Sequence, residues 1–257
     1  MVEAIFFDID GTLVSFKTHK IPSSTIDALH QLQAKGIKLF IATGRGKEGL
    51  EILNQFEFDG YITLNGQYCY DKSGHIIYEN GLHPKDMETI VEYVEKNQIP
   101  CAFKEEHDQF YNFKNELVEE LHAITNNDNH PLGDIKRAIN HKIYQVTCFV
   151  DLEKEAEILK LCPHTTSSRW FHSFCDLSPL GGTKHNGIVQ VCKHLNIDIK
   201  NTMGFGDGGN DVPMLQCVNL SIAMGNACDE LKSIADFVTK DVDDDGISYA
   251  LKHFDLI

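Results

Sequence analysis

The stretch Ala4-Ile5-Phe6-Phe7-Asp8-Ile9-Asp10-Gly11-Thr12 organises the fold predicted for this chain. A short apolar run that stops at Gly is typical of a strand buried on both faces of a sheet. Side chains two positions apart on a strand point the same way, so Asp8 and Asp10 can converge at its carboxyl end. Two such carboxylates repel unless a cation or a shared proton lies between them. The alternative is an Asp-rich turn, which needs no apolar strand ahead of it.

Strand and helix patterns alternate along the first part of the chain and again along the last part. This alternation is typical of a parallel sheet covered by helices, an α/β fold. A helix capped by Ser23 or Ser24 is predicted after the first strand, with Gly36 beyond its end. Small or polar residues follow the other strands: Thr43-Gly44-Arg45 after Ile37–Ala42, Asn65-Gly66 after Tyr61–Leu64, and Asp207-Gly208-Gly209-Asn210-Asp211 after Thr202–Gly206.

Residues 83–180 depart from this alternation and form the pattern of a smaller α+β unit. Pro and Gly cluster at both of its edges, in Leu82-His83-Pro84 and Pro179-Leu180-Gly181-Gly182, as they do in linkers. We therefore expect a core made of residues 1–82 and 181–257, interrupted by this unit. Its predicted elements include strands at Cys101–Lys104, Gln109–Asn112 and Ile143–Val150, helices at Glu116–Ile124 and Leu152–Leu161, and a polar loop at Asn126–His130.

The composition narrows the function classes. The formal net charge is −15, which argues against nonspecific binding to nucleic acid or to anionic membranes. No apolar run is long enough to span a bilayer, and a strand begins almost at Met1, so we expect no membrane anchor and no signal peptide. The 8 cysteines form no Cys-x-x-Cys pair and are expected as free thiols in a reducing cytoplasm. The 13 histidines show no zinc spacing.

The polar residues at the strand ends suit a phosphate and a metal ion together. Lys184 opens a predicted helix, where backbone N–H groups and the helix dipole favour an anion. Hydroxyl, ammonium and glycine-rich amide groups suit a phosphate. The carboxylates of Asp8, Asp10 and Asp207 suit a hard cation with oxygen ligands, which points to Mg²⁺.

Four of these segments resemble, in order, the four motifs of the haloacid dehalogenase (HAD) superfamily. Asp8-Ile9-Asp10-Gly11-Thr12 resembles the first, Thr43 the second, Lys184 the third, and Gly206 through Asp211 the fourth. The insert between the second and third motifs is similar to the type IIB α/β cap of the Cof-like phosphatases. The resemblance covers essentially the whole chain. It implies a Rossmann-like three-layer α/β core with a parallel sheet, plus an inserted α+β cap domain.

The resemblance also implies an enzyme, a Mg²⁺-dependent phosphatase that works through an aspartyl-phosphate. Asp8 would be the nucleophile and Asp10 the general acid and base. Mg²⁺ would be held by the Asp8 carboxylate, the Asp10 backbone carbonyl and Asp207. The phosphoryl group would be bound by Thr43, Gly44, Lys184 and Asn210. The expected substrates are small phosphorylated metabolites, above all sugar (hexose) phosphates, and the expected protein is a cytoplasmic monomer or weak homodimer.

Several supporting residues have two open interpretations. Asp211 is either a direct metal ligand or a helix cap and partner of other site residues, and Thr12 is expected to hydrogen-bond locally. Arg45 is either a solvent-facing charge or a substrate contact. Substrate choice is assigned to Arg45, Asn65 and Arg169. Around Arg169, the aromatic residues Trp170 and Phe171 contact substrate in one interpretation and fill the cap core in the other.

Two other functions use the same motifs. A phosphomutase would keep the phosphate on Asp8 rather than lose it to water, and a noncatalytic protein would only bind phosphate. Release of inorganic phosphate separates the phosphatase from the mutase. A calcium site is not expected: Asp241-x-Asp243-x-Asp245-Gly246 matches half of an EF-hand loop, but Lys252 stands where that loop needs Glu.

Overall fold

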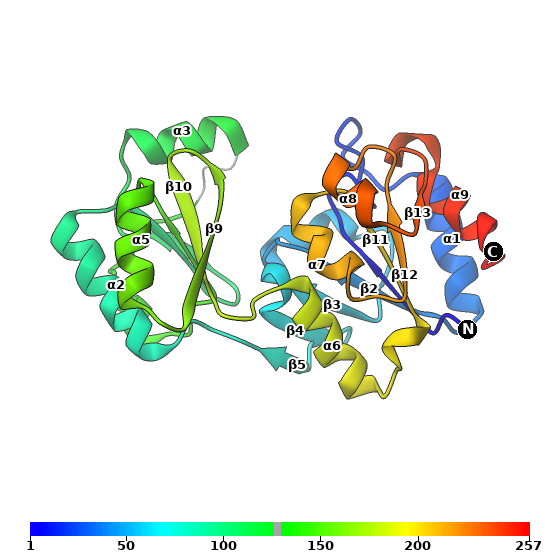
Figure 1. Cartoon of the computed structure of the whole chain (residues 1–257), viewed down its shortest axis with the longest axis horizontal. Coiled ribbons are helices and arrows are strands. Elements are labelled where there is room, and N and C mark those ends of the chain that lie inside the picture. The colour runs from blue at the N-terminus through cyan, green and yellow to red at the C-terminus, as the bar shows by residue number, and fades with distance from the viewer. Residues whose placement is uncertain (126–129) are drawn as a thin grey trace. The chain divides into compact units, whose positions relative to one another are not determined.

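The computed structural model describes residues 1–125 and 130–257, and the chain divides into two compact units. Unit 1 consists of Met1–Glu79 and Gly182–Ile257, and unit 2 consists of Asn80–Gly181. Both ends of the chain belong to unit 1 (Figure 1). Among the described residues, no helix has the length and apolar character needed to cross a bilayer. The predicted polar loop at Asn126–His130 lies, except for His130, outside the described residues.

Unit 1 is built on one large sheet. Its strands are β1 (Ala4–Phe7), β2 (Lys38–Ala42), β3 (Gly60–Thr63), β4 (Tyr68–Asp71), β5 (Ile76–Glu79), β11 (Thr202–Gly206), β12 (Leu220–Ala223) and β13 (Phe237–Val238). They lie in the order β13-β12-β11-β1-β2-β3-β4-β5. The strands from β13 to β3 run parallel, and β4 and β5 are antiparallel. Strand β1 is fully buried between β11 and β2, which explains its unbroken apolar run.

Helices cover both faces of this sheet. The helices are α1 (Ser23–Ala34), α6 (Lys184–Leu195), α7 (Val212–Leu215), α8 (Asp229–Ile234) and α9 (Gly246–His253), and the 3₁₀ turns are η1 (Lys47–Leu53), η2 (Leu64–Gly66), η3 (Ile199–Asn201), η4 (Gly209–Asp211) and η5 (Val242–Asp244). Helices α1 and α9 pack together on one face, and α6 and α7 lie on the other (Figure 1). One apolar cluster fills the layers on either side of the strands. The predicted three-layer α/β core is confirmed.

Two local features differ from the sequence-based expectations. The β4–β5 hairpin was not predicted, because its strands are short and Ile76 on the edge strand is half exposed, so no apolar run marks it. The predicted cap of α1 is also wrong. The helix follows Pro22, no side chain caps it, and Ser24 Oγ donates instead to Asp245 Oδ1. The acidic loop around Asp243 also binds residues of the loop after β1. Asp243 accepts a hydrogen bond from Ser15 and forms an ion pair with Lys17.

Unit 2 is an α+β unit with an apolar core of its own, as predicted. Its strands are β6 (Cys101–Lys104), β7 (Gln109–Tyr111), β8 (Gln145–Cys148), β9 (Thr165–Phe171) and β10 (Phe174–Pro179), and its helices are α2 (Pro84–Asn97), α3 (Glu116–Thr125), α4 (Arg137–Asn140) and α5 (Leu152–Leu161). The sheet is antiparallel, in the order β7-β6-β8-β10-β9. Helix α2 packs against α4 and α5 over one face of it.

Gly66 allows helix α6 to approach the end of β3. Its φ of +93° lies in the left-handed region, and a Cβ at this position would come within 2.1 Å of the Thr183 carbonyl oxygen. Thr183 is the N-cap residue of α6, and its Oγ1 accepts a hydrogen bond from the backbone N–H of Asn186 at 3.3 Å. The close contact therefore fixes the first turn of α6, where Lys184 stands.

We expect Gly66→Ala to destabilise unit 1 and to displace the first turn of α6. The substitution combines a positive φ with a collision, so it should cost at least about 2 kcal/mol of unfolding free energy. Gly74→Ala is the matched control, because Gly74 has a φ of +83° but no atom within 4 Å of the added carbon. Urea unfolding of both variants measures the difference. Equal losses in the two variants would contradict the proposed collision.

Candidate active site

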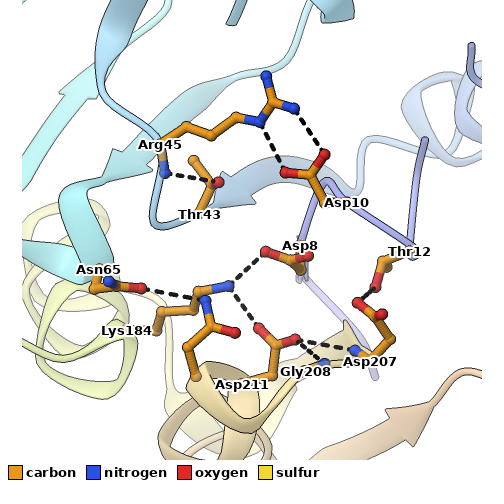
Figure 2. Close-up of polar contacts among 11 residues, drawn as sticks. Asp8, Asp10, Thr12, Thr43, Arg45, Asn65, Lys184, Asp207, Gly208 and Asp211 are labelled. Atoms are coloured by element: carbon orange, nitrogen blue, oxygen red, sulfur yellow. Dashed lines mark hydrogen bonds and ion pairs between the residues drawn. The ribbon is translucent and has the colours of Figure 1, made fainter. Parts of the chain in front are cut away.

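The buried ammonium of Lys184 lies between two carboxylates. Its Nζ donates to Asp8 Oδ1 and to Asp211 Oδ1, each at 2.5 Å (Figure 2). The Lys184 and Asp211 side chains are fully buried, and Asp8 is nearly so. Three elements therefore meet at one charge: the end of β1, the turn η4 and the first turn of α6.

Asp211 uses both of its oxygens inside the protein. While Oδ1 accepts from Lys184, Oδ2 accepts from the backbone N–H groups of Asp207 at 2.9 Å and Gly208 at 3.0 Å. A carboxylate engaged in this way orients its partners and leaves little capacity for a direct metal bond. These contacts favour the positioning interpretation of Asp211.

Asp207 lies at the end of β11, beside the loop that follows β1. Thr12 Oγ1 donates to Asp207 Oδ1 at 3.1 Å, so Thr12 makes the local hydrogen bond expected of it (Figure 2). Gly11 has a φ of +79°, and a Cβ there would come within 2.3 Å of Asp207 Oδ2. The Gly between Asp10 and Thr12 is therefore required by the approach of Asp207.

The site carries more negative than positive charge. Burial, and then the charge of Asp211, raise the pKa of Asp8 to about 8. The same two causes raise the pKa of Asp207 to about 6, against a hydrogen bond from Thr12. Burial acts to lower the pKa of Lys184, but Asp211 and Asp8 outweigh it and raise that pKa. A single buried ammonium thus faces two buried carboxylates, Asp8 and Asp211, and the partly buried carboxylate of Asp207.

A divalent cation fits this imbalance. Asp8, Asp207 and Asp211 each offer a carboxylate oxygen, and these oxygens lie within 4.8 Å of one another. An all-oxygen donor set suits a hard cation such as Mg²⁺. Because Asp211 is already engaged by three donors, Asp8 and Asp207 are the side chains best placed to hold the ion.

Arg45 binds both oxygens of Asp10. Its Nε donates to Oδ2 at 2.8 Å and its Nη2 donates to Oδ1 at 2.7 Å (Figure 2). Its Nη1 donates to the Gly49 carbonyl at 2.9 Å. Both side chains remain about one-third exposed. A two-pronged contact of this kind fixes the orientation of a carboxylate. The guanidinium of Arg45 is therefore held by protein groups, so Arg45 is not a free solvent-facing charge.

The remaining predicted residues of unit 1 lie at the ends of β2 and β3. Thr43 is buried after β2, and its Oγ1 accepts from the backbone N–H of Arg45 at 3.1 Å. Gly44 faces the amide of Asn65, which has a φ of 54°. Asn210 Nδ2 donates to Asn65 Oδ1 at 3.3 Å.

Asn226 belongs to this constellation and was not among the predicted site residues. Its Nδ2 donates to the Gly11 carbonyl at 2.8 Å and lies 3.4 Å from Asp207 Oδ2. Its Oδ1 accepts from the backbone N–H of Val242 at 2.9 Å. The available signal was its place at the end of β12, in the tripeptide Met224-Gly225-Asn226, the same kind of position as the other site residues.

Arg169 lies in unit 2, apart from the other predicted site residues, all of which belong to unit 1. Its Nε and Nη2 donate to Glu155 Oε2 at 2.8 and 2.6 Å, and further N–H groups donate to the carbonyls of His172 and Val150, each at 2.9 Å. These contacts favour a structural role for Arg169. Phe171 stacks on Phe174, whereas the side chain of Trp170 lies outside the described part of the structure.

Comparison with known proteins supports one family. A family model described as haloacid dehalogenase-like hydrolase matches residues 5–251. The chain is 34% identical over 258 residues to "Putative phosphatase YkrA" of Bacillus subtilis (strain 168), covering 98% of each chain. Among solved structures, a sugar phosphatase of HAD subclass IIB shares 41% identity at a TM-score of 0.83, over 100% of both chains. A HAD phosphatase from Bacteroides thetaiotaomicron shares 34% identity at a TM-score of 0.92, over 100% of this chain and 96% of that one.

The chain therefore belongs to the haloacid dehalogenase superfamily of hydrolases. Within that superfamily it is a phosphatase of the Cof-like group, with the inserted α+β unit of subclass IIB, and it acts on phosphorylated small molecules. The predictions of the family, the fold class and the enzyme class are confirmed.

We expect the metal-free protein to become less stable as the pH rises from 6 to 8. Folding raises the pKa of Asp8 and Asp207 from an ordinary 3.8 to about 8 and about 6. The folded chain then holds protons that the unfolded chain has released, so stability falls with rising pH; Lys184 stays protonated throughout. Mg²⁺ binds the ionised carboxylates and should therefore raise Tm more at pH 8 than at pH 6.

Thermal unfolding with chelator or with Mg²⁺, at both pH values, measures this effect. Asp207→Asn removes one of the carboxylates and should reduce the difference. Asp27→Asn, the same chemical change on the exposed face of α1, should leave it intact. A Mg²⁺ shift of the same size at both pH values would show that these carboxylates do not hold the ion.

Arg169→Ala should lower the stability of unit 2 without changing substrate preference. The variant leaves the buried Glu155 without its ionic partner, a loss of about 2–4 kcal/mol in unfolding free energy. Values of kcat/KM for a sugar phosphate and for a small aryl phosphate should change by the same factor. A loss confined to the sugar phosphate would instead support the specificity role.

Proposed function

We propose that this phosphatase is a Mg²⁺-dependent phosphomonoesterase that hydrolyses small phosphorylated metabolites, above all hexose phosphates, through an aspartyl-phosphate on Asp8. One observation carries the proposal: the buried ammonium of Lys184 binds Asp8 and Asp211, and a third carboxylate, the partly buried Asp207, lies close to them at the carboxyl ends of β1 and β11. Such a site is short of positive charge, and a phosphate monoester brings further negative charge to it. A metal ion together with cationic phosphate ligands resolves both deficits.

The metal ion would be held by the carboxylates of Asp8 and Asp207 and by the backbone carbonyl of Asp10. When bound, it supplies positive charge against the phosphate oxygens and the attacking carboxylate. Asp211 holds Lys184 and the backbone of Asp207 in place. Asn226, through the Gly11 carbonyl and Asp207, steadies the loop on the other side.

The chemistry then falls to two carboxyl groups. Asp8 attacks phosphorus and forms a P–O bond as the bond to the ester oxygen breaks. Asp10 gives a proton to that leaving oxygen, then takes one from the water that attacks the phosphorus and frees Asp8. Arg45 donates one hydrogen bond to each oxygen of Asp10, and each oxygen keeps a further lone pair that can carry the proton. Lys184, Thr43 and the backbone N–H groups beside Gly44 bind the phosphoryl oxygens.

Substrate choice has to come from groups that do not serve the phosphoryl transfer. The sugar phosphatase of subclass IIB, 41% identical over the full chain, supports a hydroxyl-rich substrate. Arg45 and Asn65 are the candidates in unit 1, since both lie at strand ends beside Asp10 and Thr43. We propose that unit 2 acts as a cap that excludes water during attack by Asp8. Eight free thiols support a reducing, cytoplasmic setting, and we propose a monomer or weak homodimer.

Asp8→Asn should abolish turnover and leave the fold intact. The amide cannot attack phosphorus, so kcat should fall by at least about 10⁴-fold. The variant removes a buried charge at nearly constant volume, so Tm should not fall. Release of inorganic phosphate from a panel of sugar phosphates, with and without Mg²⁺, measures the activity, and Asp27→Asn is the matched control.

Substantial residual phosphate release by Asp8→Asn would rule out the covalent route. Full activity of the unaltered protein in chelator would rule out the metal. A phosphorylated product that accumulates without inorganic phosphate would indicate a phosphomutase instead.

A further inference from the structure

Unit 2 contains a second cluster of metal-ligating side chains, formed by His83, Asp86 and His164. His83 is the N-cap residue of α2, Asp86 lies in its first turn, and His164 lies between α5 and β9. Each residue offers one ligand atom, and these atoms lie within 4.8 Å of one another. The two imidazole rings stack at a centroid distance of 4.2 Å. None of these residues takes part in the phosphatase site described above.

The carboxylate of Asp86 is fixed in position. It is buried, and its Oδ2 accepts from the backbone N–H of His164 and from Thr165 Oγ1, each at 2.8 Å. The protein thus holds one oxygen of this carboxylate, and the other oxygen, Oδ1, lies within hydrogen-bond distance of His164.

The spacing of the ligand atoms suits a tetrahedral ion. Asp86 Oδ1 and His164 Nδ1 lie 3.2 Å apart. In a tetrahedral site with metal–ligand bonds of about 2.0–2.1 Å, ligand atoms lie about 3.3–3.4 Å apart. The Nδ1 of His83 contacts the Lys85 N–H at 3.3 Å, a long hydrogen bond that a metal ion can replace.

The cluster also opens to solvent. His83 and His164 line a cavity of about 560 Å³ in unit 2, together with Met87, His141 and Leu180. The His164 side chain is about half exposed, whereas the Asp86 side chain is buried. An ion can therefore enter from the cavity, and a fourth coordination position can face it.

We propose that His83, Asp86 and His164 form a binding site for a dication of the zinc class, with the fourth position open to this cavity. Two imidazoles and one carboxylate form one of the ligand sets that bind zinc in proteins, whereas the Asp8 site offers only oxygen ligands. The ligands are 78 positions apart in the sequence between Asp86 and His164, so no short spacing marks the site. It forms only when the turn after α5 reaches the start of α2.

The site joins the two segments through which unit 2 connects to unit 1. His83 directly follows the first of these segments, residues 80–82. The second is tied to the same place, because Leu180 N–H donates to the His164 carbonyl at 2.9 Å. Asn80 Nδ2 in turn donates to the Leu180 carbonyl at 3.2 Å. A bound ion would therefore cross-link the beginning of unit 2 to the loop that holds its end.

The test is zinc binding by the whole chain in excess Mg²⁺, which keeps the oxygen site occupied. Competition with a chromogenic chelator should give one tight zinc site in the unaltered protein. His83→Ala and His164→Ala should each weaken it by at least about 10–100-fold, the loss already expected for a residue that only supports a ligand. His75→Ala is the matched control, because His75 Nδ1 also contacts a carboxylate, Asp71 Oδ2 at 3.1 Å, but is highly exposed and belongs to neither metal-ligating cluster found among the described residues.

Zinc-edge anomalous diffraction gives a second readout that does not depend on affinity. The ion should lie within bonding distance of His83, Asp86 and His164. Circular dichroism of the two variants, in which partly exposed residues are replaced, checks that they remain folded. Absence of a tight site, an equal loss in His75→Ala, or an ion bound only elsewhere would overturn the proposal.

Discussion

The ammonium of Lys184, buried between Asp8 and Asp211, is the interaction on which the rest of the site depends. A buried lysine is tolerated only when carboxylates balance it, and buried carboxylates only when a cation balances them. The pair therefore fixes three separate pieces of chain at once: the end of β1, the turn η4 and the start of α6. The close approach of Gly66 to Thr183 has the same effect, because it determines how near the first turn of α6, and with it Lys184, lies to the strands.

The charges of this site do not cancel, because the carboxylates outnumber the ammonium. One ammonium cannot neutralise the two buried carboxylates of Asp8 and Asp211 together with the partly buried Asp207, and burial, with the charge of Asp211, raises the pKa of Asp8 and of Asp207. Repulsion among these carboxylates costs free energy in the metal-free protein, and binding of a cation would remove that cost. Asp10 has different surroundings. It pairs with Arg45 at a more exposed position, and it does not belong to the cluster of Asp8, Asp207 and Asp211. Two neighbouring carboxylates of one strand end thus acquire separate chemistry from their surroundings.

The parts of the fold that were predictable are those encoded locally. Strand β1 is a fully buried apolar run, and strands such as β11 and β12 end where a Gly or polar residue stops the run, so their positions follow from the sequence. We predicted Asp8, Thr43 and Asp207 as site residues because each follows such a strand, and Lys184 because it opens a helix. The Arg45–Asp10 pair, the internal contacts of Arg169 and the link from Asn226 to Gly11 were not found. They depend on which distant side chains meet, and no periodicity records that.

The order of the strands has a consequence for how the chain is made. Strand β1 pairs with β2 on one side and with β11 on the other, and the partner of Ala4 in β11 is Thr202. During synthesis, unit 2, which ends at Gly181, is made as one continuous segment before β11, which begins at Thr202, so it can start to fold first. Until β11 has been made, β1 can pair only with β2, and its other edge stays unpaired. Asn80 and Leu180, hydrogen-bonded although 100 positions apart, then bring the two halves of unit 1 together as if a short loop joined them. A folded insert thereby converts a slow, long-range strand pairing into a nearly local one.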